Sequence, residues 1–108
     1  MKDIDEARVL KAMEYLADTD SAYAVEKATV ERTEILRKRS RARVFLTTEG
    51  TVAERQAQAE THADVAAADD EYITAVKAYE ELRARRQRAE LLVDVFRTLE
   101  SSRRVAMR

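Results

Sequence analysis

The second half of the chain carries its most regular pattern of apolar positions. From Tyr72 onwards, such positions recur at alternating steps of three and four residues. That spacing is typical of the contact stripe of a coiled coil. The stripe consists of Tyr72, Val76, Tyr79, Leu82, Arg86, Ala89, Val93, Phe96 and Leu99 or Glu100. We expect its large apolar members, Tyr72, Val76, Tyr79, Leu82, Val93 and Phe96, to form the core and oligomer seam of a long helix.

The first half shows a looser version of the same pattern. Its apolar positions are Val9, Met13, Leu16, Tyr23 and Val30, followed by Ile35, Ala42 and Phe45. Nothing obliges a helix to stop in this half, although the side chains of residues 18–21 compete for backbone hydrogen bonds. The pattern therefore predicts one helix from about residue 4 to residue 47.

A sharp junction separates the two halves. Gly50 is the only glycine, and a glycine just past a helix end closes the last turn in a left-handed conformation. Thr51 and Glu54 then form the pattern of a capping box, which starts a new helix. We expect a turn at 47–51, a helix from about 52 to 101 and a frayed tail at 102–108. Residues 61–64 resemble a further cap, so a short helix before a longer one is the alternative.

These elements predict an all-α fold: one domain, residues 1–108, formed by a long antiparallel helical hairpin that resembles a coiled coil. One hairpin buries only a narrow stripe on each helix, which is a small core for 108 residues. Other apolar side chains would lie beside the stripe, namely Leu36, Val44, Leu46, Leu91 and Leu92. We therefore expect self-association, as a dimer that forms a four-helix bundle.

Composition agrees with long helices. The chain has no proline, one glycine, no cysteine and no tryptophan, and 38% of its residues are charged. Without cysteine there is no disulfide framework and no cysteine-ligated metal. The N-terminus is acidic where a signal peptide is basic, and no apolar run reaches the length of a membrane span. We expect a cytoplasmic protein.

Charge alternates in blocks along the chain. Residues 1–30 carry 4 basic and 7 acidic groups (net −3), residues 31–46 carry 6 and 2 (+4), residues 47–81 carry 2 and 9 (−7), and residues 82–108 carry 8 and 3 (+5). Folding at Gly50 would place residue i opposite residue 100 − i, which brings most blocks of opposite sign together. Each exposed pair contributes only about 0–1 kcal/mol, but their sum favours the antiparallel register.

Two arginine-rich clusters are the candidate contacts for nucleic acid or for a protein partner. One contains Arg83, Arg85, Arg86 and Arg88, and the other contains Arg37, Lys38, Arg39, Arg41 and Arg43. Such clusters can hold phosphates by charge and counterion release. We favour the alternative, in which they are solvated helix faces paired with acids one turn away.

Residues suited to catalysis or metal binding are sparse. His62 is the only histidine, and the positions one turn away, Gln58 and Ala66, are not metal ligands. Consecutive acids at 69–71 point about 100° apart on a helix, so they cannot converge on one substrate. The chain contains no phosphate loop, dinucleotide fingerprint or nucleophile–base motif. We expect no enzyme activity, no cofactor and no metal.

Two segments carry a resemblance to a known group of proteins. They are residues 45–55, FLTTEGTVAER, and residues 91–104, LLVDVFRTLESSRR. In these segments the chain resembles small all-helical proteins of tailed bacteriophages and prophages, which are often encoded near recombination and single-strand-annealing genes. The resemblance implies an accessory role in a phage and assigns no catalytic residue.

The sequence thus leaves three functional hypotheses. The first is an oligomeric helical interaction module that binds an unidentified protein partner, in DNA recombination or replication. The second is direct DNA binding through the arginine clusters. The third is inhibition of a host enzyme through the same surface. A DNA-binding protein would lose affinity steeply with salt, whereas an interaction module would ignore an oligonucleotide at near-physiological salt.

Overall fold

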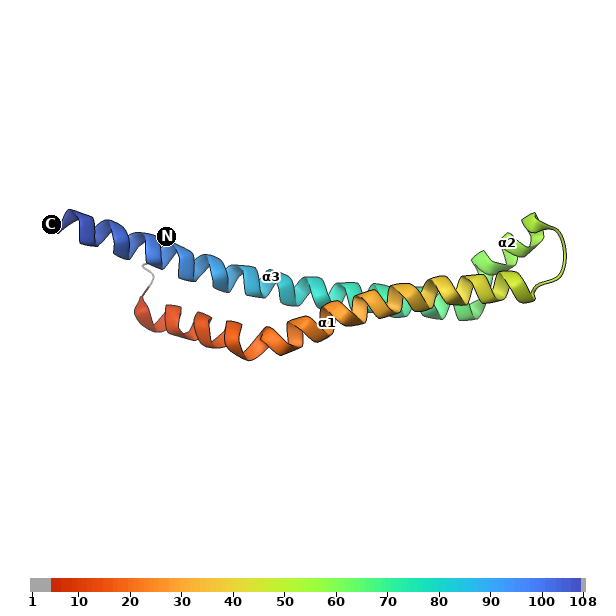
Figure 1. Ribbon diagram of the computed structural model, residues 1–108, viewed down its shortest axis with the longest axis horizontal. Coiled ribbons are helices and arrows are strands. Elements are labelled where there is room, and N and C mark those ends of the chain that lie inside the picture. The colour runs from red at the N-terminus through yellow and green to blue at the C-terminus, as the bar shows by residue number, and fades with distance from the viewer. Residues whose placement is uncertain (1–4, 108) are drawn as a thin grey trace. The chain divides into compact units, whose positions relative to one another are not determined.

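The computed structural model describes residues 5–107 and shows an all-α chain, as the sequence predicts. Three helices follow one another: α1 at Glu6–Thr47, α2 at Val52–Thr61 and α3 at Ala63–Ala106 (Figure 1). Asp5 caps the start of α1, because its carboxylate accepts a hydrogen bond from the backbone N–H of Arg8 at 2.8 Å. The expected start at residue 4 lies outside the described residues. No helix within residues 5–107 is long and apolar enough to cross a membrane.

The chain divides into two compact units. Unit 1 comprises Met1–Tyr23 and Glu81–Arg108, and unit 2 comprises Ala24–Glu80. In unit 1, the first turns of α1 pack against the last third of α3 through Val9, Ala12 and Val93, with Ala89, Leu92 and Phe96 packed beside them. Leu16 of α1 meets Arg86 of α3 further along, so the two segments run antiparallel.

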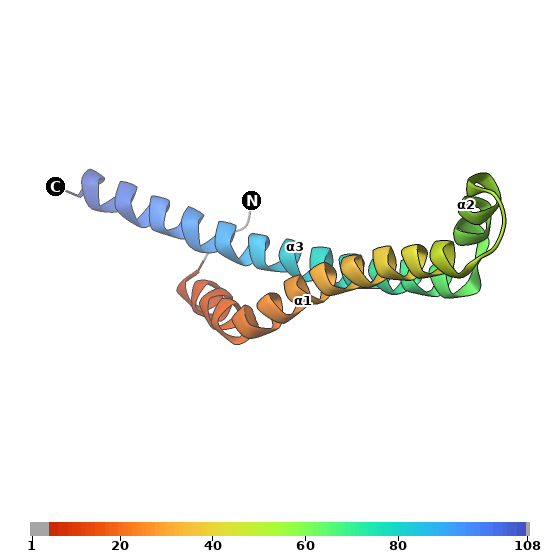
Figure 2. The ribbon, with the colours of Figure 1, turned by 45° about the vertical axis from the view of Figure 1, so that its right-hand side comes forward.

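Unit 2 contains the turn and parts of all three helices. Val44 of α1, Ala59 of α2 and Val65 of α3 form one buried cluster, and Val65 is only 1% exposed. Away from this cluster, Arg41 meets Asp69 and Arg37 meets Tyr72, so α1 and α3 also run antiparallel here. Figure 2 shows α2, in green, beside the last turns of α1.

Both long helices bury a strict heptad stripe. In α1 its positions are residues 9, 12, 16, 19, 23, 26, 30, 33, 37, 40 and 44, and in α3 they are residues 65, 68, 72, 75, 79, 82, 86, 89, 93, 96 and 100, all buried or half-buried. The stripe of α3 includes five of the six predicted seam residues, and Val76 lies half-buried beside it. Leu82 and Val93 are buried, whereas Tyr72, Tyr79 and Phe96 are half-buried.

The stripe predicted for α1 needs correction. Met13, Ile35 and Ala42 are exposed, whereas Ala12, Thr33, Ser40 and Val44 are buried. The hydroxyl of Thr33 donates to the Thr29 carbonyl oxygen at 2.8 Å, which lets a polar residue occupy a buried position. The prediction followed the large apolar residues, but close packing in this helix uses small side chains.

The second half of the chain also differs from the prediction. Two helices, separated at His62, replace the expected single helix from about 52 to 101, as the alternative reading of residues 61–64 allowed. Because α2 takes up the first ten residues, α3 begins at Ala63, and residue 44 meets residue 65 rather than residue 56. The helix α3 then continues through Ala106, five residues beyond its expected end, instead of leaving a tail from 102.

The turn shows the predicted positive φ of its glycine and the threonine half of the predicted capping box. Gly50 has a φ of +121°, which non-glycine residues rarely adopt. Thr51 caps α2, since its hydroxyl accepts from the backbone N–H of Glu54 at 3.2 Å. His62 ends α2 and starts α3, because its Nδ1 accepts from the backbone N–H of Asp64 at 3.0 Å.

Candidate functional site

Arg86, in the arginine cluster at residues 83–88, is not a surface residue. It is 8% exposed, and it reaches from α3 to α1 within unit 1. Its Nη1 donates to the Leu16 carbonyl oxygen at 2.9 Å and to Thr19 Oγ1 at 2.6 Å, while Nη2 donates to Asp20 Oδ1 at 2.6 Å. The guanidinium also lies 4.9 Å from the Tyr23 ring centroid. Arg86 is therefore withdrawn from any external phosphate.

The other arginines of this cluster differ in their surroundings. Arg85 donates from Nε to the Tyr15 hydroxyl at 3.4 Å, and Arg83 also has an interaction partner. Arg88 is exposed and lines a shallow hollow of about 430 Å³ between α1 and α3. Arg8 and Lys11 line the same hollow. The fold thus adds two cations to Arg88 that sequence spacing did not connect with it, because they come from the opposite end of the chain.

The cluster near the turn is largely engaged in contacts within unit 2. Arg37 lies 4.5 Å from the Tyr72 ring centroid, and Lys38 pairs with Glu34 at 3.3 Å. Arg41 bridges two elements, since it meets Glu60 of α2 at 3.2 Å and Asp69 of α3 at 3.5 Å. Within residues 5–107, no ion pair joins Arg39 or Arg43, and both are exposed.

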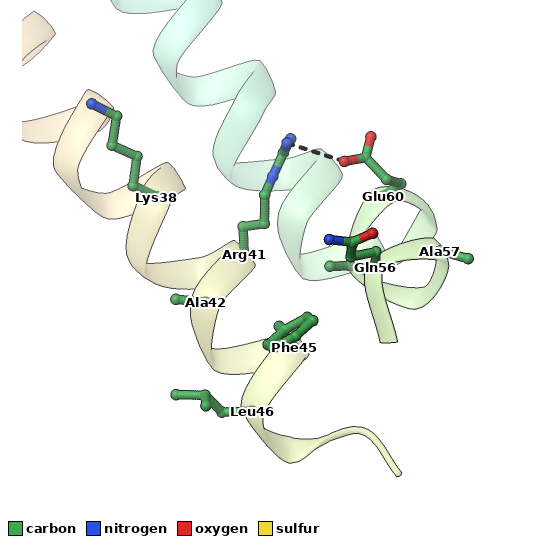
Figure 3. A pocket seen from close by; sticks show the side chains of 9 residues that line it. Lys38, Arg41, Ala42, Phe45, Leu46, Gln56, Ala57 and Glu60 are labelled. Carbon is green, nitrogen blue, oxygen red and sulfur yellow. Dashed lines mark hydrogen bonds and ion pairs between the residues drawn. The ribbon is translucent and has the colours of Figure 1, made fainter. Parts of the chain in front are cut away.

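A mostly apolar groove lies between the last turns of α1 and α2. It encloses about 800 Å³, and most of its lining is apolar (Figure 3). Ala42, Phe45 and Leu46 form the α1 wall, Ala57 and Ala59 lie on α2, and Lys38, Arg41, Gln56 and Glu60 supply its polar edge. Leu46 is 72% exposed. We name this site the α1–α2 groove.

Contacts at two points join α2 to α1 beside the groove. Arg55 of α2 donates from Nε to the Phe45 carbonyl oxygen at 2.9 Å, and its guanidinium stacks 4.3 Å from the Phe45 ring centroid. At the other edge, the Arg41–Glu60 pair joins the two helices, as the dashed line in Figure 3 shows. The helix α2 is therefore fixed at two points to α1, with apolar surface left open between them.

Sequence reasoning identified only part of this groove. Arg41 and Lys38 were candidate contacts, but Phe45 was expected in the core and Leu46 beside it. The groove arises because α2 is a separate short helix, which packs against the last turns of α1 instead of forming the first part of α3. The cap pattern at 61–64 was the signal that pointed to this arrangement.

The part of the chain that the structure describes contains no set of metal ligands. Residues 5–107 contain no group of three or more His, Cys, Asp or Glu side chains placed to hold an ion. His62 is engaged as a helix cap, and its Nδ1 lies 3.9 Å from Asp64 Oδ2.

In comparisons with protein families, curated proteins and solved structures, nothing matches this chain.

Proposed function

We infer that the chain is a non-enzymatic, oligomeric helical interaction module, which binds helical segments of proteins rather than DNA. The observation that carries this inference is the contrast between the two candidate surfaces. Arg86, Arg41 and Arg37 make contacts within the chain, whereas the α1–α2 groove leaves apolar surface open. An apolar groove lined by helices suits the apolar face of an amphipathic helix.

Self-association is part of this proposal. Among the described residues, the buried apolar side chains are eight, and seven of them are valine or alanine: Val9, Ala12, Val44, Ala59, Val65, Ala75, Leu82 and Val93. Such a core is small, while Leu10, Ile35 and Leu91 are at least half exposed. A dimer that forms a four-helix bundle would cover part of this surface.

The resemblance to small phage proteins indicates a biological context for this module. We propose an accessory role of a bacteriophage or prophage protein in DNA recombination or replication, exerted on a protein partner in the cytoplasm. Inhibition of a host enzyme would use the same groove and differs only in the identity of that partner.

Size-exclusion chromatography with multi-angle light scattering tests the proposal, with and without a labelled single-stranded oligonucleotide at about 150 mM salt, where phosphate contacts are already weakened. We expect a mass near twice the 12.4 kDa of one chain and no co-elution of the oligonucleotide. Co-elution that weakens steeply with salt would overturn the proposal in favour of DNA binding.

One observation favours direct nucleic-acid binding as the second candidate. Arg8, Lys11 and Arg88 line one hollow that has no acidic residue among its lining side chains. If this hollow binds phosphates, replacing all three by glutamate removes oligonucleotide binding. Replacement of Arg97, Arg103 and Arg104, three cations of the same unit, is the matched control and leaves most of the binding intact.

A further inference from the structure

Helix α1 carries a second regular stripe, which faces away from α3. Its members follow alternating steps of four and three residues: Leu10, Glu14, Ala17, Ser21, Ala24, Ala28, Glu31, Ile35, Lys38, Ala42 and Phe45. On a helix this stripe lies about 150° around from the buried one. All of these residues are exposed except Phe45, which is half-buried against α2. We name this stripe the outer face of α1.

The chain itself already docks a helix on this face. In unit 2, α2 packs against the end of the outer face at Phe45, and the α1–α2 groove opens directly beside it at Ala42 and Lys38. The next turn of the face ends at Ile35, which is 50% exposed. The uncovered part is thus continuous with an existing helix–helix interface.

Charge indicates what covers this surface. Residues 31–46, which surround it, carry six basic and two acidic groups, net +4. One segment of opposite sign is the first part of α1: residues 5–20 carry five acids and two bases, net −3, and expose Leu10 on their own outer face. A second copy therefore supplies an acidic helix with an apolar stripe of the same 3.5-residue spacing.

We propose that the first turns of α1 from a second copy dock, antiparallel, on the outer face of α1 in unit 2 and occupy the α1–α2 groove, so that a protein partner binds there by displacing them. The proposal deepens the self-association in the function proposed above and rests on it. It differs from a four-helix bundle, because the second copy covers the side of α1 that faces away from α3. Each copy carries one acidic segment and one groove, so two copies hold the partners for two such contacts.

One register satisfies size along the stripe and charge at Glu14 and Lys38. With residue i opposite residue 52 − i of the second copy, Phe45 meets Ala7, Ala42 meets Leu10 and Ile35 meets Ala17. Each large side chain then faces an alanine, which permits close packing. Lys38 meets Glu14 in the same register.

Along the edge of the interface that carries Lys11 and Asp18, residue i lies near residue 50 − i of the second copy, because edge positions are offset from the central stripe. Asp18 of one copy lies near Arg32 of the other, which is favourable. Lys11 lies near Arg39, where two long exposed side chains can turn into solvent and contribute little.

A charge exchange between Glu14 and Lys38 tests the proposal. Each single variant, Glu14→Lys or Lys38→Glu, places two like-charged pairs in its own dimer, and we expect each dimer to weaken about tenfold or more. A 1:1 mixture of the two variants pairs opposite charges at both sites, so we expect mixed dimers to form with near wild-type affinity. Light scattering and native mass spectrometry measure both effects.

Exposed leucines provide a matched apolar test. Leu10→Gln removes a docking side chain that is 55% exposed, whereas Leu91→Gln changes an α3 leucine that is 63% exposed and lies off the outer face of α1. We expect the first variant to weaken the dimer and the second to leave it unchanged. Circular dichroism at 222 nm checks that both variants keep wild-type helix content.

The outcomes separate this inference from the proposed function. A wild-type dimer that survives every variant, or a mixture that fails to restore pairing, overturns the inference and leaves the interaction module standing with a different dimer surface. Oligonucleotide co-elution at about 150 mM salt overturns the proposed function. A wild-type chain that is monomeric at about 100 μM overturns both the inference and the self-association on which it rests, and the groove then belongs to another protein.

Discussion

At the scale of single residues, Arg86 occupies a position where the heptad stripe of α3 would ordinarily hold an apolar side chain. Three hydrogen bonds to α1 compensate its guanidinium, although Nε has no partner among the described residues. Its acidic partner Asp20 has a side chain that is 72% exposed. Water therefore screens the ion pair, and the bonds to Leu16 and Thr19 contribute more than the charge does.

This balance predicts different effects for three substitutions. Arg86→Ala removes all three bonds and leaves a gap, so we expect the free energy of unfolding to fall by about 2 kcal/mol. Asp20→Ala lowers it by less than about 1 kcal/mol, because the pair is screened. Arg86→Met restores an apolar stripe and keeps the free energy within about 1 kcal/mol of wild type. Urea unfolding followed by circular dichroism measures all three, and equal losses in Asp20→Ala and Arg86→Ala would contradict this account.

The sequence indicated that Arg86 lies in the seam but not what it binds. The 3.5-residue spacing places position 86 on the buried face of α3 whatever the partner helix is. Its partners at Leu16, Thr19 and Asp20 depend on the register between two distant segments, which no local pattern contains. The same limit applies to Thr33 and Ser40, which only close packing against α3 identifies as buried.

At the scale of elements, the turn at Gly50 depends on a backbone conformation that only glycine adopts readily. The φ of +121° is strained for any residue with a Cβ, and a Cβ at this position would also meet the carboxylate of Glu54. We expect Gly50→Ala to lower the free energy of unfolding by about 2 kcal/mol.

A second variant separates the two causes. Glu54→Ala removes the side chain that the new Cβ would meet, so Gly50→Ala in that background measures the backbone cost alone. We expect most of the loss to persist, because the Glu54 side chain is flexible and can move aside. Loss of the effect in the Glu54→Ala background, again in urea unfolding, would show that the collision rather than φ matters.

Local signals predicted the start of α2 and, as an alternative, its end. Thr51 starts α2 as the pattern indicates, and Gly50 takes the positive φ that the turn requires, although α1 already ends at Thr47. At residues 61–64 the cap is His62 rather than Thr61, whose hydroxyl donates back to the Ala57 carbonyl oxygen at 3.0 Å. Histidine is an uncommon cap, so the sequence allowed this break without requiring it.

At the scale of the whole molecule, the small buried core makes stability depend on what covers the remaining apolar surface. The charge blocks that suggested a hairpin form individual ion pairs within the chain, such as those of Arg41 with Glu60 and Asp69. The exposed acidic start of α1 and the basic end of the same helix leave complementary surface for a second copy. Composition alone predicted association, but the separate α2 and its groove were needed to indicate where.

Association of this kind couples thermal stability to concentration, because a partner that binds only the folded chain stabilises it by mass action. Raising the protein from about 5 to about 200 μM stabilises a dimer by about 2.2 kcal/mol, or roughly 1 kcal/mol per chain, so we expect Tm to rise by about 4–8 °C. In Lys38→Glu the dimer is about tenfold weaker, so at each concentration we expect its Tm to lie below that of wild type, near the value of wild type diluted tenfold. Thermal scans at both concentrations measure the effect. A wild-type Tm that ignores concentration would mean that the folded chain is stable alone, and that the outer face of α1 is kept for a different protein.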